Sequence, residues 1–328
     1  MSVLIVTQSQ DVETVTAVTR ALEARGGTAF RFDTDRFPTE VQAAVRYEQS
    51  TEQMTLHANG HAIDLTEVTA VWQRRFNGGG KIPSDLDPQI RYTCVVESQR
   101  ALWGMLVSLP AFHLDPVAQV RLVEHKQLQL RVARRLGLRV PRTLITNHPN
   151  AVRAFKSDCP DGLVTKMLEP CLIPTKSGSK GVFTTTLASD DFEHLDGLQL
   201  CPMVFQERVP KRLELRVTIV GQRVFTAAVD SQAIDGAEVD WRREPERVIE
   251  AWERYTLPDD VERRLLTLMN RFGLNYGAID LILTPDDRYV FLEVNPGGQY
   301  LWIENHLSLP ISEAIADVLL AGPSSSIP

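Results

Sequence analysis

Apolar positions in the first part of the chain follow two spacings, which predict strands and helices in turn. Residues 2–7 form an apolar run typical of a buried strand, and residues 11–25 then repeat apolar side chains at helical spacing before Gly26-Gly27. Residues 28–32 are the next predicted strand, and this strand–helix–strand order predicts an open α/β sheet. The turn at residues 8–10 contains no glycine, so the dinucleotide-binding fingerprint is absent and this unit is expected to be a scaffold.

The remaining elements follow from the same periodicity. The predicted strands are 68–72, 143–146, 163–168, 204–209, 213–221 and 223–230, the last two forming an antiparallel pair. The predicted helices are 88–109, 117–136, 151–156 and 257–272. Residues 175–181 are predicted to be a flexible, basic, glycine-containing loop between strands, and the tail from Ala321 is expected to be disordered.

Two short apolar strands near the C-terminus carry candidate metal ligands. Asp280 lies on the first strand, residues 277–282, while Glu293 and Asn295 lie on the second and share a face because they are two residues apart. The turn residues at 284–288 allow a hairpin that brings Asp280 close to this pair. Hard oxygen ligands suit Mg²⁺, which usually takes one or two carboxylates together with phosphate oxygens and water. The pattern therefore indicates a metal–nucleotide site in an enzyme rather than a hairpin with solvated acids.

Alternation also predicts which side chains share a face on two strands. On the second hairpin strand, Phe291 is expected on the ligand face, with Leu292 and Val294 on the other face. On the strand 213–220, Glu214 and Arg216 lie together, about 7 Å apart, opposite an apolar face. This spacing fits either an ion pair on a solvated face or a functional site.

Several basic residues are candidate phosphate ligands. Lys166 interrupts a short apolar strand, where a lysine needs an anion or a path to solvent, whereas Lys126 on its own also fits a solvated helix position. The residues from Ser177 to Gly181 offer backbone N–H groups that can wrap a polyphosphate, although they do not form a P-loop motif. Around the strand 213–220 the sequence is locally basic, which fits anionic ligands such as ATP and carboxylates.

Composition narrows the class of protein only slightly. The chain of 328 residues is 43% hydrophobic and 23% charged, as in globular proteins, and its length allows two or three packed subdomains. The net charge of −7 gives no argument for nucleic-acid binding. No apolar run approaches the ~20 residues of a membrane span, and no basic region precedes the first strand as in a signal peptide. A cytoplasmic enzyme is therefore expected.

The cysteines argue against a metal or disulfide framework. Cys94, Cys159, Cys171 and Cys201 lie far apart and form no Cys-x-x-Cys motif. We expect reduced and mostly buried thiols.

The basic and acidic residues, taken in order, resemble the ATP-grasp superfamily. The resemblance spans residues 113–305 and includes Lys126, Lys166, the glycine-containing loop, the segments 205–209 and 214–221, Asp280 and the segment 293–296. Within the superfamily the chain is most similar to the graspetide synthetases, which are microviridin- and plesiocin-type macrocyclases of ribosomally made peptides. The strings that carry this similarity are 71–75, 214–221, 225–232, 240–242 and 298–304.

The resemblance implies an α/β ATP-grasp fold in three parts. These are an N-terminal α/β domain at 1–112, a central lid domain with the phosphate loop at 113–204, and a C-terminal ATP-grasp domain at 205–322 followed by a tail at 323–328. ATP would bind between the central and C-terminal parts. The implied partner is a precursor peptide with a leader and a core, the leader docking on the central lid near residues 166–187, and a homodimer is assumed.

The resemblance also implies roles for individual residues. The implied ATP-binding residues are Lys126, Lys166, Ser177, Gly178, Lys180, Gly181, Gln206, Glu207, Val209 and Glu214. Asp280, Glu293 and Asn295 would hold Mg²⁺, and Arg216 would act in catalysis by stabilising the charged phosphoryl and tetrahedral states.

Three functions remain open at this stage. The leading one is an ATP-dependent macrocyclase, which activates Asp or Glu side chains of a peptide as acyl phosphates for attack by Thr or Ser hydroxyls (ω-ester) or by Lys (ω-amide). A ligase of the glutamate-ligase type, acting on free amino acids, would share every ATP-binding residue, so only the strings 225–242 and 298–304 favour the macrocyclase. A nucleotide-binding regulator without catalysis would have no need of Asp280, Glu293, Asn295 and Arg216 together.

Overall fold

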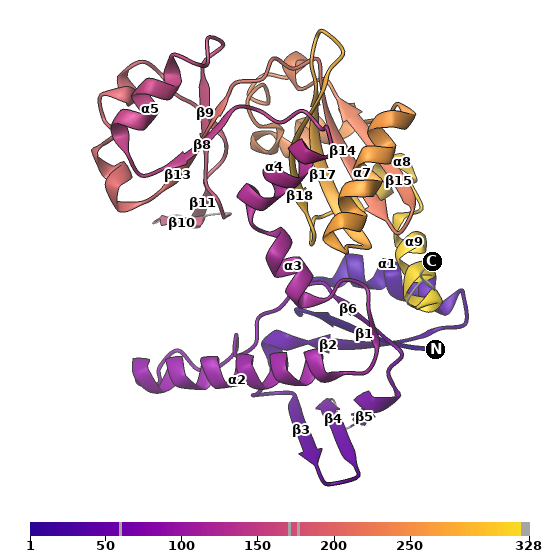
Figure 1. Ribbon diagram of the computed structural model, residues 1–328. Helices are drawn as coiled ribbons and strands as arrows, with labels where there is room; N and C mark the ends of the chain where they lie inside the picture. Colours follow the sequence, from indigo (N-terminus) through magenta and orange to yellow (C-terminus); the bar gives the residue numbers. More distant parts are fainter. Residues whose placement is uncertain (59–60, 170–171, 176–177, 323–328) are drawn as a thin grey trace.

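The N-terminal part is built on a parallel sheet of order β2-β1-β6-β7, as the apolar runs predict. The strands are β1 Ser2–Thr7, β2 Thr28–Asp33, β6 Ala70–Gln73 and β7 Phe112–His113. Helices α1 (Val12–Glu23) and α2 (Pro88–Ser108) cover opposite faces, because Val3 and Ile5 pack with α1 while Leu4 and Val6 pack with α2. A strand covered on both faces explains the unbroken apolar run. These elements come from a computed structural model that describes residues 1–58, 61–169, 172–175 and 178–322 (Figure 1).

A small antiparallel sheet lies beyond α2, and the sequence pattern does not predict its strands. It consists of β3 (Gln42–Tyr47), β4 (Glu52–Ala58) and β5 (His61–Asp64) in that order. Met54 and Leu56 point into the same core as Leu4. Figure 1 shows this sheet as an appendage at the far end of the N-terminal part.

The predicted single helix over residues 117–136 is wrong, because the structure breaks it into α3 (Val117–Val123) and α4 (Lys126–Arg135). His125 is extended between them, with φ −71° and ψ 102°. The buried Gln129 side chain donates to the Val123 carbonyl at the break (2.6 Å) and exchanges bonds with the backbone of Val294 (2.8 and 2.9 Å). Gln129 thus satisfies a carbonyl that the break exposes and fixes α4 on the C-terminal sheet.

The central part contains a sheet of order β12-β9-β13-β8 and a small core of its own. Its elements are β8 Thr143–Thr146, α5 Pro149–Lys156, β9 Leu163–Lys166, β12 Thr185–Thr186 and β13 Met203–Glu207. Beneath it, β10 (Leu172–Thr175) pairs with β11 (Gly178–Gly181). The predicted loop at 175–181 is therefore wrong for Thr175 and for Gly178–Gly181, which lie in strands, and Lys176 and Ser177 lie outside the described residues.

The C-terminal part is a five-stranded antiparallel sheet of order β16-β15-β14-β17-β18. Its strands are β14 Leu213–Val220, β15 Arg223–Val229, β16 Glu253–Arg254, β17 Tyr276–Leu283 and β18 Tyr289–Asn295. Its helices are α6 Pro245–Val248, α7 Asp259–Phe272, α8 Leu301–Leu307 and α9 Ile311–Ala321. Leu215, Val217 and Ile219 pack with α7 in one core, as the alternation predicts.

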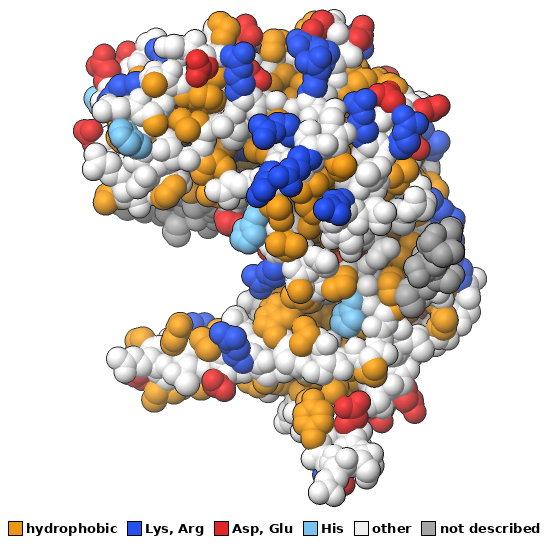
Figure 2. All heavy atoms as spheres, viewed as in Figure 1, with side chains coloured by type: hydrophobic (Ala, Val, Ile, Leu, Met, Phe, Trp, Pro, Cys, Tyr) orange, Lys and Arg blue, Asp and Glu red, His pale blue; other side chains and the backbone are white. Residues whose placement is uncertain are grey.

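The two ends of the chain are packed together. Helix α9 lies beside α1 (Figure 1), and one core cluster joins Val3 and Val18 of the N-terminal part to Val229 and Ile315 of the C-terminal part. In the space-filling view the molecule is hollowed between the central part and α2, with Lys and Arg side chains above the hollow (Figure 2).

Two general expectations can be compared with this fold. Within the part of the chain that the structure describes, no helix is both long and apolar enough to cross a membrane. Cys159 is buried, but Cys94 and Cys201 are exposed, so the expectation of mostly buried thiols is wrong for these two, and Cys171 lies outside the described residues.

Candidate functional site

Three strands of the C-terminal sheet place an arginine and two acids in one row. The register pairs Arg216 of β14 with Asp280 of β17, and Asp280 with Glu293 of β18. Asn295 follows two residues after Glu293 on the same strand. Directly opposed residues on neighbouring strands lie close enough for their side chains to interact. The register of the sheet, rather than sequence proximity, therefore assembles the site.

A β-bulge follows the row and changes which side chains face the site. The register shifts between Asp280 and Leu281, so that Leu281 pairs with Phe291 and Leu292 is the extra residue. Phe291 is fully buried in the core with Val294, whereas Leu292 lines the cleft. The prediction that Phe291 shares the face of the ligands and Leu292 does not is wrong, because it assumed unbroken alternation.

Two lysines from other parts of the chain lie close to the Glu293 carboxylate. Lys126 Nζ at the start of α4 lies 2.9 Å from Glu293 Oε2, and Lys166 Nζ at the end of β9 lies 3.9 Å away. Burial opposes ionisation of Glu293, but the two lysines outweigh it and hold the pKa of this carboxyl below its usual range. Burial lowers the pKa of Lys166, and Glu293 partly offsets this effect.

The donor atoms near Glu293 have the chemistry of a magnesium site. The Asn295 amide nitrogen donates to Glu293 Oε1 (3.1 Å) and Asp280 Oδ2 (3.3 Å), while its oxygen accepts from Lys126 (3.4 Å). Two carboxylates and one amide oxygen are hard donors that fit Mg²⁺ with phosphate and water completing its shell. Among the described residues no group of three His, Cys, Asp or Glu side chains gathers as a metal site, so the third donor here is the amide.

Arg216 is held at the base of this row by two bonds. Its Nη1 donates to Asp280 Oδ1 (2.8 Å) and its Nη2 donates to the Gln299 carbonyl (3.0 Å), while its buried Nε has no partner in the described structure. Burial opposes the charge of Arg216, but Asp280 raises the pKa of the guanidinium. A side chain on Gly298 would place its Cβ 2.5 Å from Ala278 Cβ and 3.1 Å from Arg216 Nη2. Glycine at 298 therefore lets the turn approach the arginine closely.

Glu214 pairs with Lys211 and not with Arg216. Lys211 Nζ lies 2.9 Å from Glu214 Oε1 and also donates to the carbonyls of Glu238 (3.1 Å) and Val239 (2.9 Å). Burial raises the pKa of Glu214, and Lys211 counteracts it. The reading of Glu214 and Arg216 as an ion pair with each other on a solvated face is wrong, because each has another partner and both are largely buried.

A cleft of ≈ 1100 Å³ between the central and C-terminal sheets collects most of the predicted residues. Its lining includes Lys126, Lys166, Gly181, Gln206, Glu207, Val209, Glu214, Arg216, Asp280, Glu293 and Asn295. Gln206 is anchored by a bond from its amide to Thr143 Oγ1 (3.0 Å), and Glu207 accepts from the Arg142 backbone N–H (2.9 Å). The backbone of Gly178 and Lys180 pairs with β10, opposite Thr175 and Ile173, and Ser177 lies outside the described residues.

Solved structures of known proteins match this fold over almost their whole length. The chain is 46% identical to the macrocyclase MdnC of Microcystis aeruginosa MRC, solved bound with the precursor peptide MdnA, with a TM-score of 0.89 over 98% of this chain and 100% of that one. The chain belongs to the graspetide synthetase family.

Further comparisons agree with this assignment. The model of the MvdD pre-ATP grasp domain matches residues 2–121. MdnB of the same organism is 40% identical, with a TM-score of 0.83 over 98% of this chain and 99% of that one. A peptide-associated ATP-grasp ligase from Chryseobacterium gregarium, solved with ADP and a leader and core peptide, is 32% identical, with a TM-score of 0.93 over 97% and 96%. No curated protein matches the sequence. The predicted ATP-grasp fold and family are confirmed.

Sequence reasoning missed several residues of this graspetide synthetase cleft. Asp240 and Arg242 form a two-bond ion pair (2.7 and 2.8 Å) on the cleft lining, and Asp240 also accepts from the Thr184 backbone N–H (3.1 Å) of the central part. In the sequence, the segment 240–242 contributes only to the family resemblance. Lys211 could have been found from its position three residues before Glu214, whereas the Asp240–Thr184 contact has no signal in the sequence.

Proposed function

We propose that this protein is an ATP-dependent macrocyclase of a ribosomally made precursor peptide. The γ-phosphoryl group of ATP passes to an Asp or Glu side chain of the peptide, which forms an acyl phosphate and releases ADP. A Thr or Ser hydroxyl or a Lys amine of the same peptide then attacks the acyl carbon and displaces phosphate, giving an ω-ester or ω-amide. The observation that carries the proposal is the row Arg216–Asp280–Glu293, onto which lysines from α4 and the central sheet converge inside one cleft.

The cleft suits a nucleotide and a peptide side chain together. Its ≈ 1100 Å³ exceeds the ~300–1,000 Å³ of an ordinary small-molecule site. Lys126 and Lys166 would bind phosphate oxygens, with the backbone of Gly178, Lys180 and Gly181 covering them. Ser177, which belongs to the same predicted set, lies outside the described residues. The segment from Gln206 through Glu207 to Val209 would meet the adenine, and Glu214 would accept the ribose hydroxyls.

Phosphoryl transfer to a carboxylate brings two anions together, so the site must supply positive charge. Asp280, Glu293 and Asn295 would hold Mg²⁺, which offsets phosphate charge when bound. Arg216 lies beside Asp280 and would stabilise the charged phosphoryl group in the first step and the oxyanion of the tetrahedral intermediate in the second. Lys166 lies on the central sheet, so closure of this part over the cleft would bring Lys166 to the phosphates beside Lys126. The same closure would exclude water from the activated carboxyl group.

The proposal also covers the domain boundaries, the docking of the peptide leader, the oligomeric state and the location of the enzyme. We assign residues 1–112, 113–204 and 205–322 to the three domains of the fold, and we place the docking of the peptide leader on the central domain. The enzyme would work as a homodimer in the cytoplasm, where ATP and newly made peptide are both available. Sedimentation of the purified protein tests the dimer, and a mass of one chain would contradict it.

Co-expression with a precursor peptide tests the activity. Because MdnC is bound to MdnA in its structure, MdnA is the first peptide to use, beside any short peptide encoded next to this gene. We expect the peptide to lose one water mass for each crosslink, and hydroxide treatment separates esters, which open, from amides, which persist. The Glu293→Gln variant is the control, and its product should have the unmodified mass.

The same experiment separates the alternatives. Consumption of ATP with free amino acids but never with peptides would favour the glutamate-ligase type. Nucleotide binding without turnover on either substrate would favour a regulator. The intact set of Arg216, Asp280, Glu293 and Asn295 argues against a regulator. The 46% identity to MdnC, which was solved with its precursor peptide, argues against a ligase of free amino acids.

A further inference from the structure

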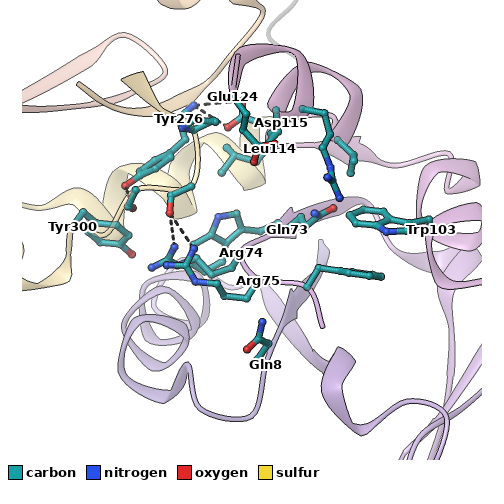
Figure 3. A pocket seen from close by; sticks show the side chains of 18 residues that line it. Gln8, Gln73, Arg74, Arg75, Trp103, Leu114, Asp115, Glu124, Tyr276 and Tyr300 are labelled. Carbon is teal, nitrogen blue, oxygen red and sulfur yellow. Dashed lines mark hydrogen bonds between the residues drawn. The ribbon is translucent and has the colours of Figure 1, made fainter. Parts of the chain in front are cut away.

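A second, smaller cavity lies behind the Gly297-Gly298 turn, between the end of β6, α3 and the C-terminal part (Figure 3). Its volume is ≈ 290 Å³. It shares Arg75, Glu124 and the residues Pro296 to Gly298 with the large cleft, so the two spaces meet at the turn that follows Asn295. The smaller cavity therefore adjoins the proposed reaction site.

Two adjacent arginines border this cavity, and they differ in how they are held. Arg74 is buried, donates to the Gly297 carbonyl (2.9 Å) and to the Gln299 side chain, and lies 3.5 Å from Asp11. Arg75 makes one long bond to the Gly297 carbonyl (3.3 Å) and has no carboxylate within ion-pair distance among the described residues. Figure 3 shows the two side chains next to each other. Arg74 thus supports the turn, while the charge of Arg75 is available to a ligand.

The surroundings of Arg75 favour an anion. Burial and the neighbouring Arg74 charge lower the pKa of Arg75, and Asp11, which is paired with Arg74, offsets this effect only in part. Of the two acids that line the cavity, Asp115 already accepts the backbone N–H groups of Asn275 (2.6 Å) and Tyr276 (3.1 Å). Glu124 is the other, and it lies exposed on the helix break.

The far side of the cavity is aromatic and carries a second cation. Phe76 and Trp103 are stacked with their ring centroids 4.0 Å apart, and the Arg121 guanidinium lies 5.7 Å above the Trp103 ring. Stacked aromatic rings provide a rigid surface for the apolar stem of a side chain. A volume of ≈ 290 Å³ lies at the low end of ligand sites, so it fits one side chain and excludes a nucleotide.

We propose that this cavity is a subsite for an acidic side chain of the peptide, with Arg75 binding its carboxylate and the Phe76–Trp103 pair contacting its stem. The proposal rests on the macrocyclase function. A peptide that crosses the Pro296–Gly298 turn would present one acid to the site at Asn295 and a neighbouring acid to Arg75. The enzyme would thereby select peptides whose acidic residues are grouped and would hold one acid while another reacts.

A coupling experiment tests this subsite. Binding of fluorescent MdnA to the Arg75→Gln variant is measured with Mg²⁺ and a non-hydrolysable ATP analogue, and crosslinks are counted separately by mass spectrometry. Each Asp and Glu of the peptide is changed in turn to Asn or Gln. One acid-to-amide change should weaken binding to the wild type about 10- to 100-fold, the range of a lost charge-assisted bond, and should have no further effect in Arg75→Gln. Arg75→Lys should recover only part of the affinity, because a lysine cannot bind a carboxylate bidentately.

Arg100→Gln is the matched control, since Arg100 lies exposed on α2 and lines neither cavity. It should bind every peptide as the wild type does. If Arg75→Gln weakens all peptides equally, with no acid-specific coupling, Arg75 only supports the turn and the subsite is wrong. If the wild type crosslinks MdnA and Arg75→Gln does so with the same affinity, the subsite is wrong while the macrocyclase function stands. A wild type that binds the peptide with this coupling but forms no crosslink would contradict the function and retain the carboxylate subsite.

Discussion

The C-terminal sheet and the central sheet both contribute to the cleft, but they are built very differently. Strand β17 is buried along almost its whole length and sits between β14 and β18, with α7 packed on one face. Strand β8 is only half-buried throughout, and β9 is buried only at Leu163. The C-terminal sheet shares an extensive core with the rest of the molecule, whereas the core of the central sheet contains only residues between 144 and 205.

The two lysines on Glu293 show what this difference means for the site. Lys126 belongs to α4, which Gln129 fixes to β18, and it lies 2.9 Å from the carboxylate. Lys166 belongs to the central sheet and lies 3.9 Å away. Residues that must keep a fixed geometry are thus on the well-packed sheet, and the cation on the lightly packed sheet can move with it. Regions with few buried apolar contacts open at lower free-energy cost.

The largest effect is expected where the two regions meet, at Glu293. Glu293→Gln removes one charge from the metal-binding set without changing its volume, and ATP turnover should fall by at least about 10³-fold. Steady-state ATPase and crosslinking assays measure the effect, and circular dichroism checks that the variant is folded. Near-normal turnover at saturating Mg²⁺ would remove Glu293 from the site.

Arg216→Lys tests the rigid side of the comparison. A lysine keeps the charge near Asp280 but cannot hold two oxygens in the plane of a guanidinium. We expect kcat to fall about 10²–10³-fold, with a much smaller change in ATP affinity.

The melting temperature of the Arg216 variants separates a catalytic role of Arg216 from a structural one. Loss of a partner from a buried pair costs about 3–5 kcal/mol, so Arg216→Ala should also destabilise the protein, whereas Arg216→Lys should be affected less. Normal turnover in Arg216→Lys would exclude a catalytic role for Arg216.

The pH dependence of stability tests whether Glu293 is ionised in the folded protein. The pKa of Glu293 is depressed in the folded state from a usual value of 4.5, because Lys166 and Lys126 outweigh the effect of burial. A depressed carboxyl pKa stabilises the fold above the usual value, and the stabilisation is lost as the pH falls through the folded value. The free energy of unfolding of the wild type should therefore exceed that of Glu293→Gln by about 1–3 kcal/mol at neutral pH. The difference should shrink as the pH falls below ~4. Chemical denaturation across pH 7 to 3 measures the difference, and a constant difference would contradict ionisation of this carboxyl.

The smallest effect is expected in hydrogen exchange, which compares the two sheets directly. With Mg²⁺ and a non-hydrolysable ATP analogue, amides of β9, β11 and β12 should exchange about tenfold more slowly, because closure of the central part protects them. Amides of β17 should change little, since that strand is already buried. Identical exchange with and without the nucleotide would contradict the role of the central part as a lid.

Much of the local structure follows from the sequence because it depends on neighbouring residues. The apolar run at β1 and the helical spacing of α1 identify their elements, and the i, i+2 spacing puts Glu293 and Asn295 on one face. Alternation failed one residue earlier, because the bulge at Leu292 depends on how β18 meets β17. The helix break at His125 was also missed, since Gln129 makes its bonds to a strand far along the chain.

The sequence by itself determined which residue types could bind phosphate and a hard cation, because their chemistry is independent of their surroundings. The tertiary structure alone decided their long-range partners: strand register pairs Arg216 with Asp280, and the docking of α4 brings Lys126 to Glu293. It also decided that Arg74 supports the Gly297 turn, while Arg75 beside it makes one long bond to the Gly297 carbonyl and has no carboxylate within ion-pair distance among the described residues. Ion pairs form between side chains that packing brings within a few ångströms, and for residues far apart in the sequence, the number of residues between them does not predict that distance.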